Sequence, residues 1–435
     1  MAEAKHQGFC AFYNRHIMKP SSPFRIVIVG GGIAGLTAAI ALRAPNRRIL
    51  VLEQSRLNKE IGALISLQPN ASKIVYDTFG LGSALEDARG MVDEGFRVYS
   101  TDGELVNQVS LAIKPEYGGS RIVYHRRDFH DALKKAAVAT DRDGEPVEIR
   151  ISSRVVGCDP DSGIVHLENG ETVEGDIIIA ADGIHSMMRK YVADTDAVPK
   201  ATGHSAYRLM IPSETLEKEE EEFCSKINPR SPFTSMVVAH NCRLVMGPGR
   251  HGEVFGIVAL VPDEQMNEDP NAKQSWVSEG NLPKMLETFS EFPQWMTSIF
   301  KHSADLGLWQ LRDIDPLAAW SRNRLILIGD AAHAMLPTQG QGASQAIEDA
   351  EALGAFFEKT VDAPSQEEIT KTFSDIFRSR HARASLIQGY SRQAAKPGTA
   401  KGDNTVTMKP DEFMDFNCVY NGAKDWLERQ SRIIT

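Results

Sequence analysis

The chain has 435 residues, of which 42% are hydrophobic and 24% are charged, and its formal net charge is -10. This is an ordinary globular composition, with enough chain for two or three domains. The negative balance argues against nucleic-acid binding and against a basic membrane-binding face, because both need clustered Lys and Arg. The five cysteines are odd in number and include no CxxC pair, so we predict neither a disulfide framework nor a metal site.

Targeting and membrane segments are not expected either. The first 22 residues lack the apolar stretch of a signal peptide. The longest apolar runs, 26–29 and 177–181, have the length of a strand and are too short to cross a bilayer. We therefore expect a cytoplasmic protein without a transmembrane segment.

The strongest local pattern is a strand–helix–strand unit near the N-terminus. The β-branched run 24–29 predicts a buried parallel strand, and residues 36–42 predict a helix that ends before Pro45. Residues 48–53 predict a second strand, which ends in the acid Glu53. This order is that of a βαβ unit with its crossover helix.

Later segments return to the same pattern. Residues 176–181 and 324–328 are continuous apolar runs that predict further buried strands, and a helix is predicted at 342–359. Between them, residues 200–262 alternate apolar and polar side chains as an antiparallel sheet does, and residues 265–304 are predicted to be helical. We therefore expect a first domain built from discontinuous segments, with a mainly antiparallel domain inserted between them.

Shorter features fill in this outline. Residues 95–108 alternate around a turn and predict an antiparallel hairpin. Residues 147–156 and 164–167 predict two strands around another turn. The acidic run 217–222 is interpreted as the solvated face of a helix.

A glycine pattern follows the first strand. Gly30, Gly32 and Gly35 fit G-x-G-x-x-G between a strand and a helix. Glycine permits the tight turn and lets backbone N–H groups approach a pyrophosphate at the helix N-terminus. Glu53 is placed to bind a ribose hydroxyl. The full context favours one dinucleotide site, whereas a second match at 247–252 precedes a strand pattern and is interpreted as a turn.

A second motif begins at Gly329-Asp330, directly after a predicted strand. Asp330 is placed to bind a sugar hydroxyl of the cofactor. Pro337, Gly340 and Gly342 then lead into a helix and leave backbone N–H groups free beside a flat ligand. The helix N-terminus favours negative charge, which fits the anionic N1–C2=O edge of a reduced flavin.

A third motif is Asp182-Gly183, at the end of the strand predicted at 176–181. Such a turn can face the cofactor phosphates or the path of a nicotinamide donor. Turn chemistry alone explains the same two residues equally well.

Together these motifs resemble the single-component FAD-dependent aromatic hydroxylases, the family of salicylate and para-hydroxybenzoate hydroxylases. The resemblance runs from about residue 24 to residue 355 and rests on three motifs in order. It implies a bound FAD, NAD(P)H as co-substrate, and transfer of oxygen from a flavin C4a-hydroperoxide to a small aromatic substrate.

The resemblance also implies cofactor contacts. Residues 61–71 resemble the stretch that lines the flavin, and residues 124–130 resemble the segment whose arginine contacts FAD, with Arg127 as the alternative to Arg126. The predicted FAD-binding residues are Gly30, Gly32, Ile33, Ala34, Gly35, Glu53, Gln54, Gly62, Ala63, Arg126, Asp182, Gly183, Gly329, Asp330, Pro337, Gly340, Gly342 and Ala343.

The expected fold class is α/β, a discontinuous Rossmann-like FAD-binding domain with an inserted, mainly antiparallel substrate domain and a helical C-terminal segment. The FAD-binding domain is predicted at 22–90, 120–195 and 305–360, the substrate domain at 91–119 and 196–304, and the helical segment at 361–435. We expect a monomer or a homodimer.

On the substrate side, the predicted catalytic residues are Arg208, Tyr207 and Pro337. Arg208 lies where fungal-type relatives often keep an arginine for a phenolate or carboxylate, and a cation there would stabilise a substrate anion. A structural arginine is the equal alternative. Pro337 is expected near the reacting ring.

Two departures from the family pattern bear on the substrate. Residues 245–248, Val-Met-Gly-Pro, stand where salicylate-hydroxylase relatives usually have Tyr-Pro, and Leu64 replaces a commonly small residue. Both favour a larger or less polar substrate than salicylate, such as a polyketide- or alkaloid-like aromatic. Candidate bases are His185, His204, His240 and His333, although a lone histidine is more often structural.

Three alternatives remain open from the sequence. One is epoxidation or dearomatising hydroxylation in a secondary-metabolite pathway. Another is an FAD-dependent dehydrogenase or reductase that hardly uses oxygen. The third is a flavin-binding protein without catalysis.

Overall fold

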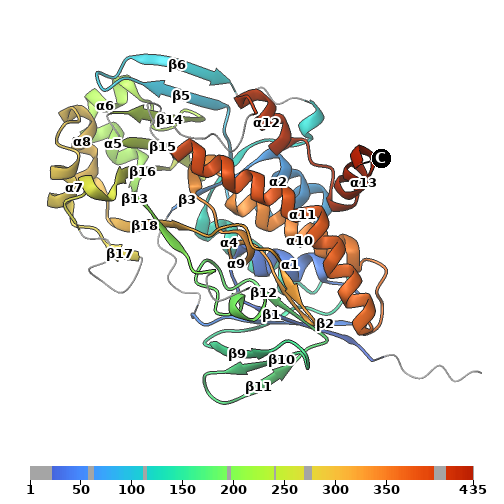
Figure 1. The fold of residues 1–435 in the computed structure, drawn as a ribbon. Helices are drawn as coiled ribbons and strands as arrows, with labels where there is room; N and C mark the ends of the chain where they lie inside the picture. Colours follow the sequence, from blue (N-terminus) through green and yellow to red (C-terminus); the bar gives the residue numbers. More distant parts are fainter. Residues whose placement is uncertain are drawn as a thin grey trace, which may run out of the picture.

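The structure is a computed structural model. It describes residues 22–56, 63–110, 115–193, 197–239, 242–268, 277–395 and 408–434. Figure 1 shows a parallel sheet with long helices packed over it and, beside it, a larger antiparallel sheet with its own short helices.

The first sheet has six strands in the order β19-β20-β12-β1-β2-β8, and all neighbours are parallel except β19 and β20. Continuous β-branched runs form its central strands because both faces are covered. The strands are β1 (Phe24–Val29), β2 (Arg47–Leu52), β8 (Glu148–Arg150), β12 (Ile177–Ala180), β19 (Ser321–Arg322) and β20 (Leu325–Leu327).

Alternate side chains of β1 point to opposite layers. Ile26 and Ile28 pack with one group of helices, whereas Val27 and Val29 pack with a small three-stranded sheet. The helices are α1 (Ile33–Leu42), α4 (Arg126–Val138), α10 (Gly342–Phe357) and α11 (Gln366–Ala395). The small sheet contains β9 (Val155–Asp159), β10 (Ile164–Leu167) and β11 (Thr172–Glu174).

The second sheet has eight strands in the order β17-β18-β13-β16-β15-β14-β5-β6, with only β14 and β5 parallel. They are β5 (Gly95–Tyr99), β6 (Leu105–Ser110), β13 (Lys200–Pro212), β14 (Phe233–Val238), β15 (Arg243–Gly249), β16 (Val254–Pro262), β17 (Val277–Glu279) and β18 (Gly307–Asp313). Its outer face packs against α5 (Ser213–Glu219), α6 (Glu221–Lys226), α7 (Leu282–Thr288) and α8 (Gln294–Thr297).

A short sheet and several small helices connect these parts. The sheet is β3 (Leu64–Leu67), β7 (Ile122–His125) and β4 (Met91–Val92). The α-helices are α2 (Pro69–Lys73), α3 (Gly82–Glu86), α9 (Asp330–His333), α12 (Pro410–Cys418) and α13 (Ala423–Ile434). The π-helix η1 spans Ile74–Thr78, and 3-10 helices occur at η2 (Pro115–Tyr117), η3 (Arg189–Tyr191), η4 (Arg250–Gly252), η5 (Asp263–Gln265), η6 (Ser298–His302) and η7 (Pro337–Gln339).

The predicted fold class is confirmed, and the βαβ unit and the 95–108 hairpin form as expected. The strand predicted at 147–156 is instead two strands in different sheets. β8 pairs with β2 and β9 pairs with β10, and Ser152, with a positive φ of 53°, lies at the break between them. Strand β18 begins just after the domain boundary predicted at residue 304. It belongs to the eight-stranded sheet, where it pairs with β13.

The acidic run 217–222 is a solvated helix face as predicted, except at Glu220, which lies between α5 and α6. Glu220 is buried, its carboxylate accepts hydrogen bonds from the Ser298 hydroxyl and the His302 ring, and Lys301 lies 3.0 Å away. Glu220 therefore fixes the helices behind the sheet. The charge run concealed it because burial depends on a partner that lies about 80 residues away in the chain.

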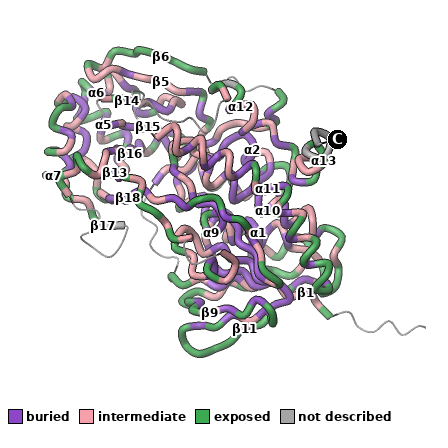
Figure 2. Tube along the Cα trace, in the orientation of Figure 1, coloured by how far each residue is buried: buried purple, intermediate pink, exposed green. Residues whose placement is uncertain are grey.

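Burial follows the layers. Figure 2 shows purple, buried chain through β1, α1 and α10, while β6, α7 and β11 are largely green and exposed. Within the described residues, no helix has the length and apolarity needed to cross a bilayer.

Candidate functional site

The glycine turn after β1 is packed too closely for any other residue at two positions. A Cβ on Gly30 would lie 2.3 Å from the Ala181 carbonyl oxygen, and one on Gly35 would lie 1.9 Å from the Gly30 carbonyl oxygen. Gly30 also has a φ of +107°, which favours glycine. These two glycines therefore let the strand, the turn and the helix come together.

The N-terminus of α1 is open. Gly32 caps the helix without a side-chain hydrogen bond, and a Cβ placed on it would meet nothing within 4 Å. The first N–H groups of Ile33, Ala34 and Gly35 point along the helix axis with the positive end of its dipole. This donor set and this space fit a phosphate group.

The turn is held by two side chains. Glu53 accepts hydrogen bonds from the Gly31 and Ser55 backbone N–H groups, both at 2.7 Å, and the His130 ring lies 2.7 Å from the Gly31 carbonyl oxygen. Each carboxylate oxygen of Glu53 keeps acceptor capacity for a ribose hydroxyl. Gln54, which follows it, is exposed.

The sheet brings the three motifs to one edge. β20, β12 and β1 are parallel neighbours, so their carboxyl ends lie side by side. A Cβ on Gly30 would lie 3.1 Å from the Asp182 Cα atom, and one on Gly329 would lie 2.9 Å from the Ala34 Cβ atom. The motifs predicted to share one ligand are therefore in direct contact.

Asp182 shapes its own turn. Its Oδ2 atom accepts hydrogen bonds from the Met187 and Met188 N–H groups, and burial raises the pKa of the carboxyl. Its Oδ1 atom is buried, and a hydrogen bond between the carboxyl and the Ser186 side chain acts against the rise in pKa. Gly183 follows with a φ of +77° and open space where a Cβ would be.

Arg189 connects the turn at Asp182-Gly183 to the turn at Gly329-Asp330. Its guanidinium donates to the carbonyl oxygens of Ile184, Asp330 and Ala331 at 2.8–3.0 Å, and the side chain is buried. Sequence reasoning missed this role, because an arginine that binds only backbone carbonyls has no recognisable charge partner in the sequence.

Asp330 begins α9, shortly after the carboxyl end of β20. Its residue surface is accessible to solvent, yet the surrounding protein atoms desolvate its carboxyl and raise its pKa. The nearby cations Arg126 and Arg189 act in the opposite direction. A carboxylate with these surroundings fits a neutral hydroxyl ligand such as that of a sugar.

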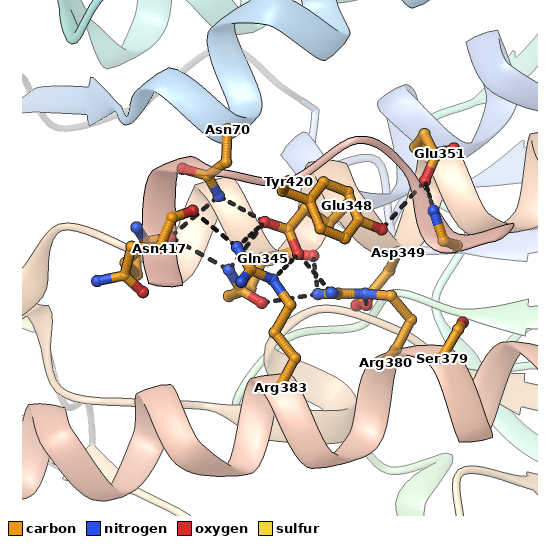
Figure 3. A network of polar contacts seen from close by, with 12 residues as sticks. Asn70, Gln345, Glu348, Asp349, Glu351, Ser379, Arg380, Arg383, Asn417 and Tyr420 are labelled. Carbon is orange, nitrogen blue, oxygen red and sulfur yellow. Dashed lines mark hydrogen bonds and ion pairs between the residues drawn. The ribbon is translucent and has the colours of Figure 1, made fainter. Parts of the chain in front are cut away.

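A fully buried ion network stands behind this turn (Figure 3). Asp349 accepts hydrogen bonds from the Gly329 N–H at 2.9 Å and from the His333 ring at 2.6 Å, and its other oxygen lies 3.0 Å from Arg380 Nε. Glu348 binds Arg380 and Arg383. Burial alone would raise the pKa of Glu348, but these two arginines hold it below its usual value.

The network reaches further in both directions. Asn70 Nδ2 donates to Glu348 at 2.5 Å, and Arg383 donates to the carbonyl oxygens of Phe416 and Asn417. The C-terminal helices are thus connected to the Gly329 turn through side chains of α10 and α11. Sequence reasoning did not identify these residues, although the adjacent acids Glu348 and Asp349 in a mainly apolar helix were a signal.

Arg126 is the better placed of the two predicted arginines. It begins α4, its N–H donates to the Ala63 carbonyl oxygen, and its charge affects the pKa values of both Asp330 and Arg208. Arg127 is exposed and lies 3.9 Å from Asp131. Ala63 is buried, whereas the predicted contact Gly62 lies outside the described residues.

The loop before α10 is close to β3. A Cβ on Gly340 would lie 2.9 Å from the Ser66 hydroxyl oxygen, and Pro337 is exposed at the start of η7. The α10 N-terminus has no side-chain cap, and Gly342 has open space beside it. Together with the half-buried Ala343, this is the open helix start predicted for the flavin edge.

Tyr207 and Arg208 point to opposite faces of β13. Arg208 shares the inner face with Ala206, which packs against Leu336 of the cofactor side. Tyr207 faces outward, where its hydroxyl donates to Glu268 Oε1 at 3.0 Å and its ring packs on Phe289. This position does not support the catalytic role predicted for Tyr207.

Arg208 is a half-buried cation without an acid among the described residues. It forms no hydrogen bond or ion pair with any residue that the structure describes, its Nε atom is buried, and its guanidinium lies 4.6 Å from the centre of the Trp309 ring. Burial first, and the charge of Arg126 second, lower the pKa of Arg208 to about 10. The side chain therefore stays charged at neutral pH.

A cavity opens next to this face. It is lined from the sheet by His204, Arg243, Leu260, Pro262 and Leu311, and from the cofactor side by Leu336, Thr338 and Ala395. It thus lies beside Pro337, the residue expected near the reacting ring.

The histidines are mostly engaged elsewhere. His333 binds Asp349. His185 lies at the surface, but desolvation of its ring by neighbouring protein atoms and then the charge of Arg312 lower its pKa. His204 lines the cavity and contacts the Thr202 carbonyl oxygen at 3.2 Å. His240 lies outside the described residues.

Comparisons with known proteins agree with this site. The FAD binding domain family matches residues 24–387. The 3-hydroxybenzoate 6-hydroxylase 1 of Aquipseudomonas alcaligenes is 32% identical over 93% of this chain and 98% of its own length. The hispidin-3-hydroxylase of Neonothopanus nambi is 29% identical over 85% of this chain and 88% of its own. A salicylate hydroxylase substrate complex superposes with a TM-score of 0.74 at 25% identity, covering 94% of this chain and 98% of that one.

The matched region contains all three turns and the sheet that bears Arg208, and the relatives are covered over nearly their whole length. The chain therefore belongs to the FAD-dependent monooxygenases of the FAD binding domain family.

Proposed function

We propose that this protein hydroxylates a small aromatic substrate that carries a negative charge, using NAD(P)H and O2. The observation that carries the choice of an anion is Arg208, a half-buried guanidinium whose Nε atom is buried and which has no acidic partner among the described residues. Buried charges are normally paired, and a truly unpaired one is costly. A substrate phenolate or carboxylate would supply the missing partner.

Residues at the edge of the parallel sheet fit FAD. The α1 N-terminus would hold the pyrophosphate, Glu53 a ribose, Asp330 and the Asp182-Gly183 turn further parts of the cofactor, and the α10 N-terminus the flavin edge. Arg126 lies between this edge and Arg208 in electrostatic reach of both. Bound FAD supplies the redox chemistry, accepting a hydride and activating oxygen.

The protein's own contribution is to position and to desolvate. Arg208 would hold the substrate anion on the inner face of the sheet and lower the energy of the phenolate, which is the more nucleophilic form of the ring. The Pro337 loop and Leu336 close the opposite side with apolar surface and keep water away. No described side chain has to take a proton from a substrate that binds already ionised.

The activities after which the relatives are named support an aromatic substrate and leave its size open. They include 3-hydroxybenzoate, hispidin and 6-hydroxynicotinate hydroxylation. Here Gly247 stands in the sheet where a tyrosine was expected, while Leu64 packs over Gly249 and Gly256. We propose a substrate of secondary metabolism, a cytoplasmic enzyme, and a monomer or homodimer.

The test is a screen of FAD-loaded protein against phenolic acids, neutral phenols and polyketide-like aromatics. NADH and NADPH oxidation, hydrogen peroxide and product mass are measured together. We expect at least one anionic aromatic to accelerate NAD(P)H oxidation and to gain one oxygen atom from O2. Stimulation only by neutral compounds would overturn the proposed anion, and product formation without oxygen transfer would overturn the monooxygenase.

A further inference from the structure

We propose that Trp309 is the positioning residue for Arg208, and that its indole ring, in place of an acid, holds the guanidinium on the inner face of the sheet so that its hydrogen-bonding edges stay available to an anionic aromatic substrate. This inference rests on the proposed function, because it concerns the same anion site. Neither Trp309 nor its strand neighbour Gly307 was a candidate from the sequence.

The register of β13 and β18 places the two side chains together. Ala206 pairs with Trp309 and Arg208 pairs with Gly307, so Trp309 is the diagonal neighbour of Arg208 on one face of the sheet. The Arg208 Cζ atom lies 4.6 Å from the Trp309 ring centre, within the range of a cation–π contact. Trp309 is only 7% exposed, so the ring surface is largely withdrawn from water.

Gly307 makes this arrangement possible. A Cβ on Gly307 would lie 2.1 Å from the Trp309 Cζ3 atom and 2.2 Å from Cη2. The indole therefore lies flat across the backbone of β18 and reaches toward Arg208. Any other residue at position 307 would push the ring away from the place where the guanidinium rests.

An indole ring can stabilise the Arg208 charge and leave its N–H donors unoccupied, whereas a carboxylate would occupy them. A carboxylate beside Arg208 would neutralise it and occupy its N–H donors, as Glu348 does to Arg383 within the buried network. The ring face stabilises the positive charge without accepting those hydrogen bonds. The Nε atom of Arg208 stays buried and without a partner, with Arg126 as the nearest charge that affects it.

A matched pair of substitutions isolates the aromatic face. In Trp309→Phe an aromatic ring is kept, and in Trp309→Leu a smaller apolar side chain without a ring takes its place. Dissociation constants are measured for FAD-loaded protein from the change in flavin absorbance, with salicylate, 3-hydroxybenzoate and 6-hydroxynicotinate as anionic probes and 3-hydroxybenzamide as the neutral probe. We expect Trp309→Leu to weaken the best-bound anion by about tenfold and Trp309→Phe by less than about threefold, with the neutral probe unchanged.

A double substitution shows whether Trp309 acts through Arg208. If it does, Trp309→Leu adds no further loss on top of Arg208→Ala, because the residue that it positions is gone. Gly307→Ala provides an independent test, and its loss should resemble that of Trp309→Leu. The control is Trp295→Leu, which removes a ring lying 5.4 Å from Lys226 on the outer side of the sheet and should leave anion binding unchanged.

The outcomes separate the two proposals. Equal losses for the anionic and neutral probes, or additive losses in the double variant, would mean that Trp309 only packs, and the inference would fall while the anion site stands. If Arg208→Ala leaves the binding of every probe unchanged, or if none of the three anions perturbs the flavin of the unaltered protein, the proposed anion site falls and the role of Trp309 falls with it.

Discussion

Two regions of the molecule surround arginines in opposite ways. Arg380 and Arg383 lie behind the cofactor edge and are surrounded by Glu348, Asp349 and backbone carbonyl oxygens (Figure 3). Arg208 lies on the substrate face, against an indole ring and without an acid in the described part of the chain. In this comparison Arg380 and Arg383, whose donors are used, belong to the framework, whereas Arg208 has donors to spare for a ligand.

The largest effect on stability is expected from removing an acid of the buried network around Arg380 and Arg383. In Glu348→Ala two fully buried guanidinium groups lose their shared carboxylate, and uncompensated buried charge costs about 3–5 kcal/mol. Thermal and denaturant unfolding of the FAD-free protein would measure the loss. Glu358→Gln is the control, because its partner Lys424 is exposed and the midpoint should not move. A stability equal to that of the unaltered protein would show that the network is not part of the framework.

A second large effect is expected at the glycine turn. Gly30→Ala places a Cβ 2.3 Å from the Ala181 carbonyl oxygen in a residue with a φ of +107°, so the turn must shift and the α1 N-terminus with it. We expect FAD to bind at least tenfold more weakly, with the dissociation constant measured from the quenching of flavin fluorescence. Gly170→Ala, also at a positive φ but with nothing within 4 Å, should retain normal affinity.

If Gly30→Ala binds FAD as well as the unaltered protein does, the phosphates do not lie at this turn. The outcome is informative even if the variant is less stable, since Gly170→Ala carries a similar backbone strain at a distance from the three turns. A loss of affinity common to both variants would point to stability alone.

Features that are encoded in neighbouring residues could be predicted from the sequence, whereas features that depend on strand register could not. The glycine turn, Asp182-Gly183 and Gly329-Asp330 are written in neighbouring residues, and their parallel strands bring them together by topology alone. Tyr207 and Arg208 are adjacent in sequence, and a single residue of register decides which of them faces the cofactor. The alternation was visible, but the inward face became clear only when Leu336 was found against Ala206.

Other features could not be derived because their partners are far apart. Arg189 binds carbonyl oxygens at 330 and 331, and Trp309 reaches Arg208 across a strand pair that spans about 100 residues. Neither contact has a sequence signature, since backbone acceptors and ring faces are present everywhere. Acidic residues 348 and 349 in an apolar helix were the one local hint of a buried network.

Substitution of Arg208 should change the binding of the substrate and leave the stability of the protein unchanged. Arg208→Ala is expected to raise the KM of an anionic substrate by about 10- to 100-fold, the equivalent of one hydrogen bond to a charged group, while the midpoint of unfolding stays the same or rises. Arg208→Lys keeps the charge without the planar donors and should recover part of the loss. A large drop in stability with an unchanged KM would instead make Arg208 a framework residue like Arg380.

The smallest effect is expected one residue away, and it sharpens the contrast most. Tyr207→Phe removes a hydroxyl whose partner is Glu268 on the outer face, so we expect a stability loss of about 1 kcal/mol and unchanged KM, kcat and coupling. Steady-state kinetics beside thermal unfolding would measure both. A drop in kcat without a change in stability would mean that Tyr207 does reach the reaction. Adjacent residues that differ in this way would show that the face of β13, and not proximity in the chain, decides which side chains serve the substrate.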